Sequence, residues 1–342
     1  MSGASTSPPS NRRVTLARLP QGMPVPEDFA LVDEPAGTPG PGEVLLRTVY
    51  LSMDPYQRSW MAGGNYGAPA GPGATVIGRA VCQVLDSRDP RFAAGQLVFG
   101  ETGWQTHPVV AADRLQPVNP ADGPISTAVG VLGSPGLTGW VGMTDICQPQ
   151  AGETVVVSAA TGAVGSVAGQ VAKLLGARVV GVAGAAEKCR FAVDTLGFDA
   201  CVSHKSNDFA ADLARACPAG VDAYFDNTGG AVTAAVFRLL RQDARVALCG
   251  LVAEYGDEDA RGPAMKHVLA AQALVRGFSV RRNLHRMAEY RALAAGWMRE
   301  GKLAYREDIA EGIENAPAAF IGMLFGHNLG KALVRVSADP TR

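Results

Sequence analysis

The sequence predicts a two-domain α/β protein, and three observations lead to that fold class. The first 130 residues read as short apolar segments separated by Gly- and Pro-rich turns, a spacing that suits a compact antiparallel β-barrel or sandwich. From about residue 151, apolar strands alternate with helical segments, which is typical of a parallel sheet. The chain has 342 residues, more than one domain usually holds.

Each strand of the N-terminal part is predicted from an apolar run between turn residues. Clusters such as 39–42 and 71–73, where Pro and Gly alternate, separate these runs. The strands are expected at residues 44–51, 76–85, 97–99 and 109–110. Residues 1–12 are rich in Ser, Pro and Gly and are predicted to form a disordered tail.

The second part predicts six strands with helices between them, which is what a complete dinucleotide-binding sheet needs. Gly176 and Gly197 stand where glycines commonly end helices. The strands are expected at 154–158, 178–183, 200–203, 223–226, 244–251 and 277–281, and the helices near 164–175, 187–196, 207–216, 231–240 and 264–274. After a further helix at 286–300, a glycine-flanked strand at 329–337 could rejoin the first domain and make it discontinuous.

The turn after the strand at 154–158 is the most informative stretch of the chain. Small residues follow the apolar run, and a helical pattern closed by Gly176 comes next. The turn consists of Ala160, Thr161, Gly162, Ala163, Val164 and Gly165. Small residues let the backbone approach a pyrophosphate, and the helix N-terminus favours its charge. Ala160 replaces the first glycine of G-x-G-x-x-G, so an ordinary glycine-rich turn is the alternative, but the strand–turn–helix context favours a nicotinamide-nucleotide site.

The composition excludes several classes of protein. The net charge is −1 with no long block of like charge, which argues against nucleic-acid binding. No apolar stretch reaches 18 residues, and the N-terminus lacks a signal-peptide pattern, so we expect neither a membrane span nor export. None of the six cysteines forms C-x-x-C, which favours reduced, buried thiols and a cytoplasmic location.

An ordered series of segments resembles the medium-chain dehydrogenase/reductase superfamily, in its zinc-independent branch of prostaglandin reductases, plant alkenal double-bond reductases and curcumin-reductase-like enzymes. The segments are LSMDPYQR at 51–58, GSPGLTG at 133–139, AATGAVGS at 159–166, YFDNTGG at 224–230, CGLVAEY at 249–255, ENAPAAFIGM at 314–323 and NLGK at 328–331. The likeness runs from about residue 14 to residue 336.

This resemblance implies a fold, an activity and an assembly. It implies a GroES-like catalytic β-barrel domain made of residues 13–130 and 311–342, with an inserted Rossmann domain at 131–310. It also implies a homodimer that uses NADPH to reduce a C=C bond conjugated to a carbonyl, in small enals, enones and 15-oxoprostaglandin-like molecules.

The choice between NADP and NAD is expected at the end of the strand at 178–183. An NAD enzyme usually places a carboxylate there, whereas this strand is followed by Gly184, Ala185 and Ala186. Glu187 and Lys188 follow, and Lys188 suits a 2′-phosphate, as the corresponding lysine does in the resembling family. Alternatively, Glu187 is the ribose acid and Lys188 a solvated helix residue. The family has serine at 185 and tyrosine at 204; His204 could approach the phosphate, although a lone histidine is more often structural.

Two tyrosines are candidate catalytic residues. Tyr56 follows the strand at 44–51, and Tyr255 follows the strand at 244–251 at the carboxyl end of the sheet. From the residues alone, Tyr56 reads as a packed aromatic, whereas Tyr255 is equally an exposed loop tyrosine. The resemblance implies that both line the substrate pocket and that Tyr255 hydrogen-bonds the substrate carbonyl and approaches the cofactor.

Two asparagines complete the candidate set. Asn328 matches a family position that touches the nicotinamide or its ribose, and alone would read as a turn residue. Asn227 lies in a glycine-containing loop near the crevice expected at the carboxyl end of the sheet. Residues 76–79 read VIGR where zinc-dependent relatives commonly have Gly-His-Glu, so no metal is expected. Two other functions stay open: quinone reduction, and a non-catalytic NADP-binding role.

Overall fold

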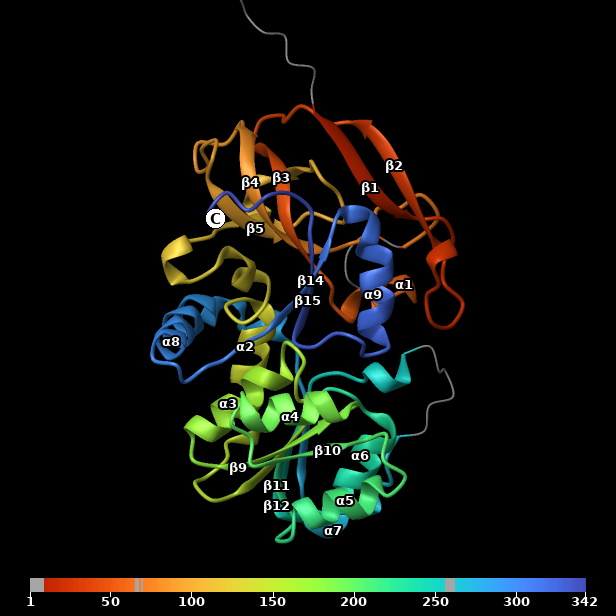
Figure 1. The fold of residues 1–342 in the computed structure, drawn as a ribbon, viewed down its shortest axis with the longest axis vertical. Coiled ribbons are helices and arrows are strands. Elements are labelled where there is room, and N and C mark those ends of the chain that lie inside the picture. Colours follow the sequence, from red (N-terminus) through yellow and green to blue (C-terminus); the bar gives the residue numbers. More distant parts are fainter. Residues whose placement is uncertain (1–8, 65–67, 69, 256–261) are drawn as a thin grey trace, which may run out of the picture. The chain divides into compact units, whose positions relative to one another are not determined.

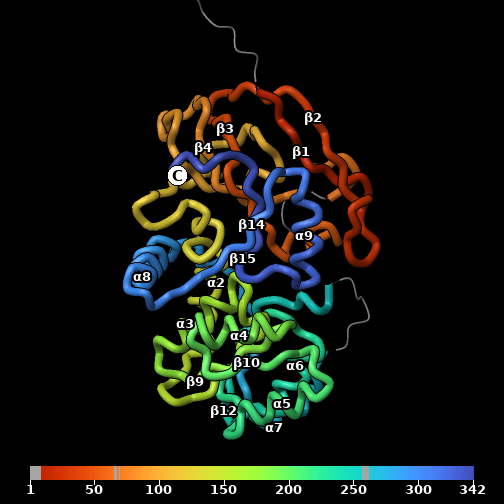
Figure 2. Tube along the Cα trace, in the orientation of Figure 1, coloured from red at the N-terminus to blue at the C-terminus, as the bar shows by residue number. Residues whose placement is uncertain are grey.

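The computed structural model describes residues 9–64, 68, 70–255 and 262–342, which form two units. Unit 1 comprises Met1–Val129, Asp308–His327 and Ala332–Arg342, and unit 2 comprises Gly130–Glu307 and Asn328–Lys331. The ribbon shows red, orange and dark blue segments interleaved in unit 1, whereas unit 2 is largely yellow to cyan (Figure 1). Unit 1 is therefore built from both ends of the chain, as the tube trace also shows (Figure 2).

Unit 1 is organised around a seven-stranded sheet. Its strands, in spatial order, are β14 (Glu307–Glu311), β15 (Lys331–Arg335), β3 (Glu43–Ser52), β4 (Arg79–Ser87), β5 (Leu97–Glu101) and β7 (Leu115–Pro117), with β6 (Val109–Ala111) also paired to β3. The register of β3 and β15 places Leu51 opposite Val334. Two helices, α1 (Tyr56–Met61) and α9 (Ala316–Leu324), belong to the same unit. Trp104 and Phe320 pack edge to face in the core.

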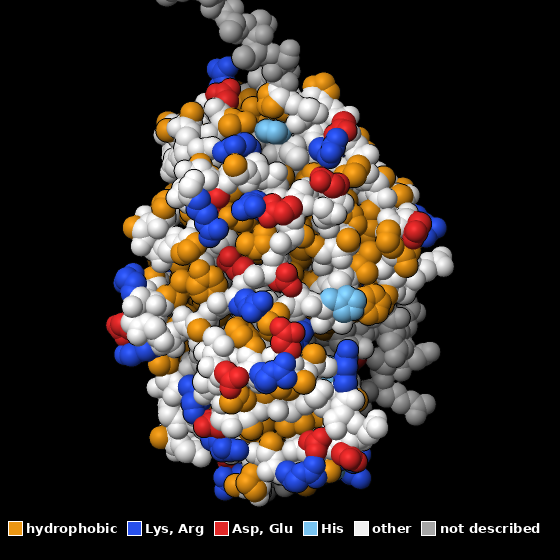
Figure 3. Space-filling view, viewed as in Figure 1, with side chains coloured by type: hydrophobic (Ala, Val, Ile, Leu, Met, Phe, Trp, Pro, Cys, Tyr) orange, Lys and Arg blue, Asp and Glu red, His pale blue; other side chains and the backbone are white. Residues whose placement is uncertain are grey.

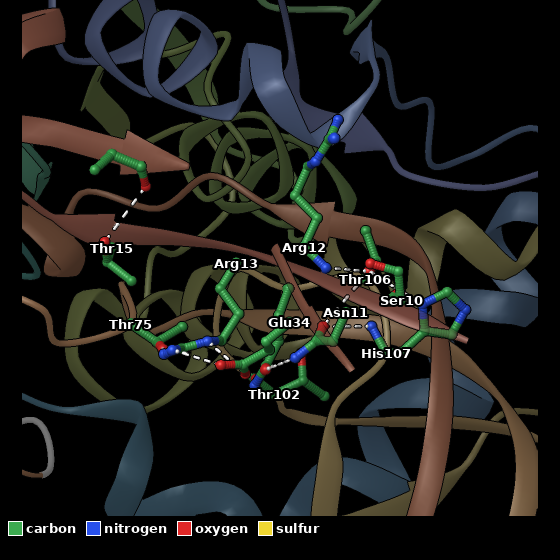
Figure 4. A network of polar contacts seen from close by, with 12 residues as sticks. Ser10, Asn11, Arg12, Arg13, Thr15, Glu34, Thr75, Thr102, Thr106 and His107 are labelled. Atoms are coloured by element: carbon green, nitrogen blue, oxygen red, sulfur yellow. Dashed lines mark hydrogen bonds and ion pairs between the residues drawn. The ribbon is translucent and has the colours of Figure 1, made fainter. Parts of the chain in front are cut away.

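The predicted tail at 1–12 is wrong from residue 10 onward, because β1 (Ser10–Leu16) begins there and pairs with β2 (Phe29–Pro35). Residues 1–8 lie outside the described part. Asn11 is buried; its amide nitrogen donates to Gln105 Oε1 at 3.0 Å, and its Oδ1 accepts from His107 N–H at 2.9 Å. Arg13 binds both Glu34 and Thr75 (Figure 4). These contacts lie far apart in the sequence, so composition alone could not indicate them.

Unit 2 contains a six-stranded parallel sheet. Its order is β10 (Ala200–Ser203), β9 (Arg178–Ala183), β8 (Thr154–Ser158), β11 (Val221–Asp226), β12 (Leu240–Leu248) and β13 (Leu274–Gly277). In chain order this is 3-2-1-4-5-6, the order of a Rossmann sheet. Every residue of β8 and β11 is buried, as expected for strands covered on both faces. The predicted fold class, a discontinuous β-rich domain with an inserted Rossmann domain, is confirmed.

Helices cover both faces of this sheet, and alternating side chains enter two cores. The helices are α2 (Ser134–Val141), α3 (Gly165–Leu174), α4 (Ala186–Asp194), α5 (Phe209–Ala216), α6 (Gly230–Phe237), α7 (Lys266–Ala271) and α8 (Met287–Arg299). Val157 and Phe225 face one core, and their neighbours Val156 and Tyr224 face the other. None of the helices in the described ranges is both long and apolar enough to cross a membrane.

Several predicted boundaries are wrong. The strand expected at 277–281 lies earlier, at β13, and a 3₁₀ helix occupies Val280–Arg286. The helix expected at 231–240 ends at Phe237, and β12 starts at Leu240 rather than 244. The strand expected from residue 76 starts at Arg79, because Val76 N–H bonds to Val14 of β1 instead. Each error follows from a tertiary partner that a local pattern does not reveal.

The described surface carries both signs of charge. On the face drawn in Figure 3, lysine and arginine side chains alternate with aspartate and glutamate over each unit. This mixture agrees with the near-zero net charge.

Candidate active site

The turn between β8 and α3 is held close to the sheet. Ala159 has a positive φ of 47°, and a Cβ on Gly165 would overlap its carbonyl oxygen and lie 3.2 Å from Cα of Ala160. Only glycine fits at 165, so the start of α3 lies directly against the backbone at the end of β8. Ala160 is fully buried, and its N–H donates to Val182 O at 3.1 Å.

The sheet also accommodates the departure from the glycine pattern at residue 160. Gly181, in the middle of β9, faces Ala160, and a Cβ on Gly181 would lie 2.9 Å from the Ala160 methyl. Because Gly181 has no side chain, the methyl of Ala160 occupies that space. The turn therefore keeps its shape without the first glycine of the fingerprint.

The remaining turn residues lead into α3 at a helix N-terminus. Thr161 is buried, whereas Gly162, Ala163 and Val164 are half-buried. A Cβ on Gly139 of α2 would lie 2.8 Å from Val164 O, so α2 packs tightly against the start of α3. The positive end of a buried helix suits an anion such as a pyrophosphate.

Three basic side chains gather at the carboxyl ends of β9 and β10. His204 N–H donates to Ala183 O at 2.9 Å, and a Cβ on Gly184 would lie 3.1 Å from His204 Nε2 and 3.5 Å from Lys205 Cε. Burial, and the positive charges of Lys205 and Lys188, lower the pKa of His204. The third basic group, Lys188, is half-buried in the first turn of α4. Such a cluster can bind a phosphate dianion.

Glu187, the alternative ribose ligand, is exposed in the same turn of α4. Ala185 is the N-cap of α4 and has no side-chain hydroxyl to cap the helix. Ala185 itself contributes no polar group to the basic cluster. Lys188 follows it in α4, and His204 and Lys205 lie near Gly184, which precedes it.

Asn227 ties β11 to β8 at the switch point of the sheet, where folds of this class bind ligands. Its Nδ2 donates to Ser158 O at 2.7 Å, and its N–H donates to Ser158 Oγ at 2.8 Å. The fully buried carboxylate of Asp226 accepts from Ser158 Oγ, Thr228 N–H and Gly229 N–H. The loops after these two strands are thus fixed by hydrogen bonds.

Tyr255 follows a 3₁₀ turn in the loop after β12, which ends at Leu248 rather than at the expected 251. Glu254 Oε1 accepts from Gly230 N–H at 2.9 Å, and Ala253 N–H donates to Thr228 O at 2.9 Å. This loop therefore packs on the loop that follows Asn227. Tyr255 is half-buried there, and it is the last residue described before 262.

Asn328 lies in a short return segment of unit 2. Its Nδ2 donates to Gly330 O at 2.7 Å, and Gly330 has a φ of 88°. A Cβ on Gly330 would lie 2.6 Å from the carbonyl carbon of Arg306, and Lys331 N–H donates to Arg306 O at 2.8 Å. The segment that carries Asn328 is therefore held against residue 306.

Tyr56 opens α1 in unit 1. Asp54 N–H donates to Gln57 Oε1 at 2.8 Å, and Gln57 Nε2 donates to Ile77 O at 2.9 Å, so the turn before the helix is fixed to the segment before β4. The Arg79 guanidinium lies over the Tyr56 ring, 5.5 Å from its centroid. This cation–π contact orients the phenol.

Several residues that the sequence pattern did not single out hold these candidates in place. They are Ser158, Gly181, Lys205, Glu254 and, as the partner of Tyr56, Arg79. Two of them left a signal: Ser158 is a polar residue closing an apolar strand, and a glycine inside a valine-rich strand marks close approach of another backbone.

Comparison with known proteins identifies the family. Residues 12–118 match a model described as the N-terminal domain of oxidoreductase, and residues 163–296 match one described as zinc-binding dehydrogenase. The NADPH-dependent curcumin reductase of Escherichia coli (strain K12) is 46% identical over 96% of this chain and 98% of its own. The chain belongs to the zinc-independent medium-chain dehydrogenase/reductases.

Two further members of this family extend the comparison. The 2-alkenal reductase (NADP(+)-dependent) of Nicotiana tabacum is 38% identical over 96% of this chain and 98% of its own. The crystal structure of CurA in complex with NADPH from Vibrio vulnificus is 44% identical, has a TM-score of 0.90, and covers 96% of this chain and 100% of its own.

One of the two matching models carries zinc in its description. In residues 9–64, 68, 70–255 and 262–342, no group of three or more His, Cys, Asp or Glu side chains could hold a metal ion. The described residues therefore do not fit a zinc site.

Proposed function

We propose that this protein is an NADPH-dependent reductase of the C=C bond of α,β-unsaturated ketones and aldehydes. The curcumin reductase and 2-alkenal reductase relatives support the substrate class and the cofactor. The observation that carries the proposal is the Gly165 turn at the switch point, together with the basic cluster of Lys188, His204 and Lys205. The turn suits the pyrophosphate of NADPH, and the basic cluster suits its 2′-phosphate.

Residues of unit 2 would hold NADPH. The turn from Ala160 to Gly165 would bind the pyrophosphate through backbone N–H groups, and Lys188 with His204 would bind the 2′-phosphate. Asn227 and Asn328 would position the nicotinamide end. When bound, NADPH supplies a hydride to the β-carbon of the conjugated double bond.

Tyr255 would stabilise the charge that develops on the substrate. As the β-carbon becomes saturated, negative charge accumulates on the carbonyl oxygen in an enolate. A phenol O–H donor held at that oxygen binds the transition state more strongly than the ground state. The fixed loop made by Glu254 and Gly230 supports this role, because a preorganised donor needs no rearrangement during the reaction. Solvent would then protonate the α-carbon.

Tyr56, whose ring lies under the Arg79 guanidinium, would contact the substrate. Tyr56→Phe tests the hydroxyl and Arg79→Met the orienting cation. We expect both variants to raise KM for the enone more than they lower kcat.

Product analysis tests the reaction. NADPH oxidation should occur with a conjugated enone, and the product should be the saturated ketone. With 4-deuterated NADPH in water, deuterium should appear at Cβ; with unlabelled NADPH in D₂O, it should appear at Cα. Tyr255→Phe should lower kcat by about 100-fold with a smaller change in KM.

Other products would support other functions. An allylic alcohol would refute the proposed reaction, and activity on quinones alone would make the protein a quinone reductase. NADPH binding without turnover of either class would leave a non-catalytic NADP-binding protein. A zinc analysis of the purified protein belongs to the same experiment, because one zinc per chain with chelator-sensitive activity would contradict a metal-independent mechanism.

We also propose a homodimer formed through the β13 edge of unit 2. Among the described strands, β13 pairs only with β12. Exposed apolar side chains lie on and near it: Met265 (63% exposed), Leu269 (80%) and Leu274 (57%). An open edge with apolar neighbours is an association site, and a twofold copy would close it. Light scattering should give twice the 35.5 kDa chain mass, and Leu274→Lys should give the monomer.

A further inference from the structure

Two cysteines of unit 2 place their sulfur atoms in direct contact. Cys201 Sγ donates to Cys189 Sγ at 3.1 Å, between β10 and the first turn of α4. Both side chains are half-buried, whereas Cys82, Cys147 and Cys217 are buried. Cys189 and Cys201 therefore differ from the other thiols in having both a partner and access to solvent.

We propose that Cys189 and Cys201 are a redox modification site, which hydroperoxides convert to a disulfide and dithiols restore. A disulfide needs an S–S distance of about 2.05 Å, so the sulfurs must close by about 1 Å. The pair is twelve residues apart in the sequence, and a closure of this size needs only a small shift of the α4 start against β10.

The surroundings divide the two thiols into an attacking and a resolving group. The hydrogen bond from Cys201 lowers the pKa of Cys189, with burial acting against it. Cys189 also lies near a helix N-terminus and next to Lys188, and both features favour a thiolate. The hydrogen bond to Cys189 and burial raise the pKa of Cys201, which therefore stays a thiol.

The chemistry balances with one hydroperoxide per pair. The Cys189 thiolate attacks the O–O bond, which gives a sulfenic acid on Cys189 and, for hydrogen peroxide, a hydroxide that takes up a proton. Cys201 then attacks the Cys189 sulfur; the S–S bond forms, the S–O bond breaks, and the Cys201 proton leaves with the oxygen as water. Two thiols are oxidised and one peroxide is reduced to two waters.

The position of the pair links this chemistry to cofactor binding, a step that rests on the proposed function. Lys188 directly precedes Cys189 in α4, and His204 lies three residues after Cys201, immediately after the end of β10. A Cβ on Gly181 would lie 3.2 Å from Cys201 Sγ and 2.9 Å from the Ala160 methyl, so the sulfur pair is separated from the pyrophosphate turn by one glycine. Closing the disulfide pulls on both sides of the basic cluster, and we infer weaker NADPH binding in the oxidised protein.

The test separates bond formation from its effect. The reduced full-length protein has six thiols, and hydrogen peroxide should leave four, with a 189–201 link in a non-reducing peptide map. Cofactor binding is followed by protein fluorescence rather than by activity. Oxidation should weaken NADPH binding at least about fivefold, which is the lower end of typical coupling between two sites, and should weaken NADH binding less. Dithiothreitol should reverse both changes.

Matched variants complete the experiment. Cys189→Ser and Cys201→Ala should lose the link and the affinity change, whereas Cys249→Ser should behave as the parent protein does. Retention of six thiols, or a link between other cysteines, would overturn the proposal. A 189–201 link without a change in NADPH affinity would overturn its connection to the cofactor. The thiol count and peptide map need neither turnover nor NADPH, so they stand even if the proposed function fails.

Discussion

Replacement of Gly165 by alanine should destabilise unit 2 through a clash of backbone with side chain. The new Cβ would overlap Ala159 O and lie 3.0 Å from the Ala159 carbonyl carbon, whereas ordinary contacts begin at 3.4 Å. Both neighbours are backbone atoms at the end of the buried strand β8, so α3 must move away from the sheet. Overpacking of this kind costs about 1–3 kcal/mol.

Gly162→Ala provides the matched control for this change. Its Cβ would meet only Ala159 O, at 3.2 Å, and a few tenths of an ångström relieve that contact. At about 2–4 °C per kcal/mol, Gly165→Ala should lower the Tm of unit 2 by roughly 2–12 °C, and Gly162→Ala should lower it by much less. Calorimetry without cofactor measures both. Equal Tm values for the parent and Gly165→Ala would refute the close approach at this turn.

Three further predictions test the cofactor site and its frame. Lys188→Glu should raise KM for NADPH by at least about 10-fold and leave KM for NADH nearly unchanged, because a charged contact contributes about 1.5–3 kcal/mol; equal effects would contradict the assignment. The pKa of His204 is lowered, so its imidazole is neutral near pH 7 and gains a proton only below its ordinary pKa of 6.5. The NADPH affinity of the parent protein, relative to that of His204→Gln, should therefore rise as the pH falls below 6.5. Parallel pH profiles of the two proteins would exclude a phosphate contact. Tyr290→Phe removes a buried 2.6 Å hydrogen bond to Val131 O and should cost about 1–3 kcal/mol in the free energy of unfolding, measured in urea; an unchanged midpoint would contradict this.

The strongest predictions came from patterns that are local in the sequence. The run from β8 through Gly165 to α3 contains its own strand, turn and helix, and the structure has all three. The alternation of strands and helices after residue 151 was sufficient to predict the Rossmann sheet. A strand that helices cover on both faces is a continuous apolar run, so it can be identified without any tertiary information.

Elements that depend on distant partners were missed or misplaced. β1 is stabilised by residues about 90 positions away, such as Gln105, and its own composition resembles a tail. The basic cluster was predicted only in part, because Lys205 joins His204 through the packing around Gly184. Local patterns also do not show which side chains fix the Tyr255 loop, since Glu254 bonds to a glycine 24 residues earlier.

The pairing of β3 with β15 has a consequence for folding during synthesis. β6 pairs with residues 43–45 of β3, but Leu51 pairs with Val334, so the C-terminal part of this edge of β3 stays open until nearly the whole chain has been made. At 5–20 residues per second, translation of the intervening stretch of about 280 residues takes roughly 14–56 s. Unit 2 emerges complete, apart from its short 328–331 segment, before that strand arrives. The nascent chain therefore carries a folded Rossmann domain beside an unfinished sheet, and during this interval the open edge of β3 is the part of the protein that chaperones would need to protect.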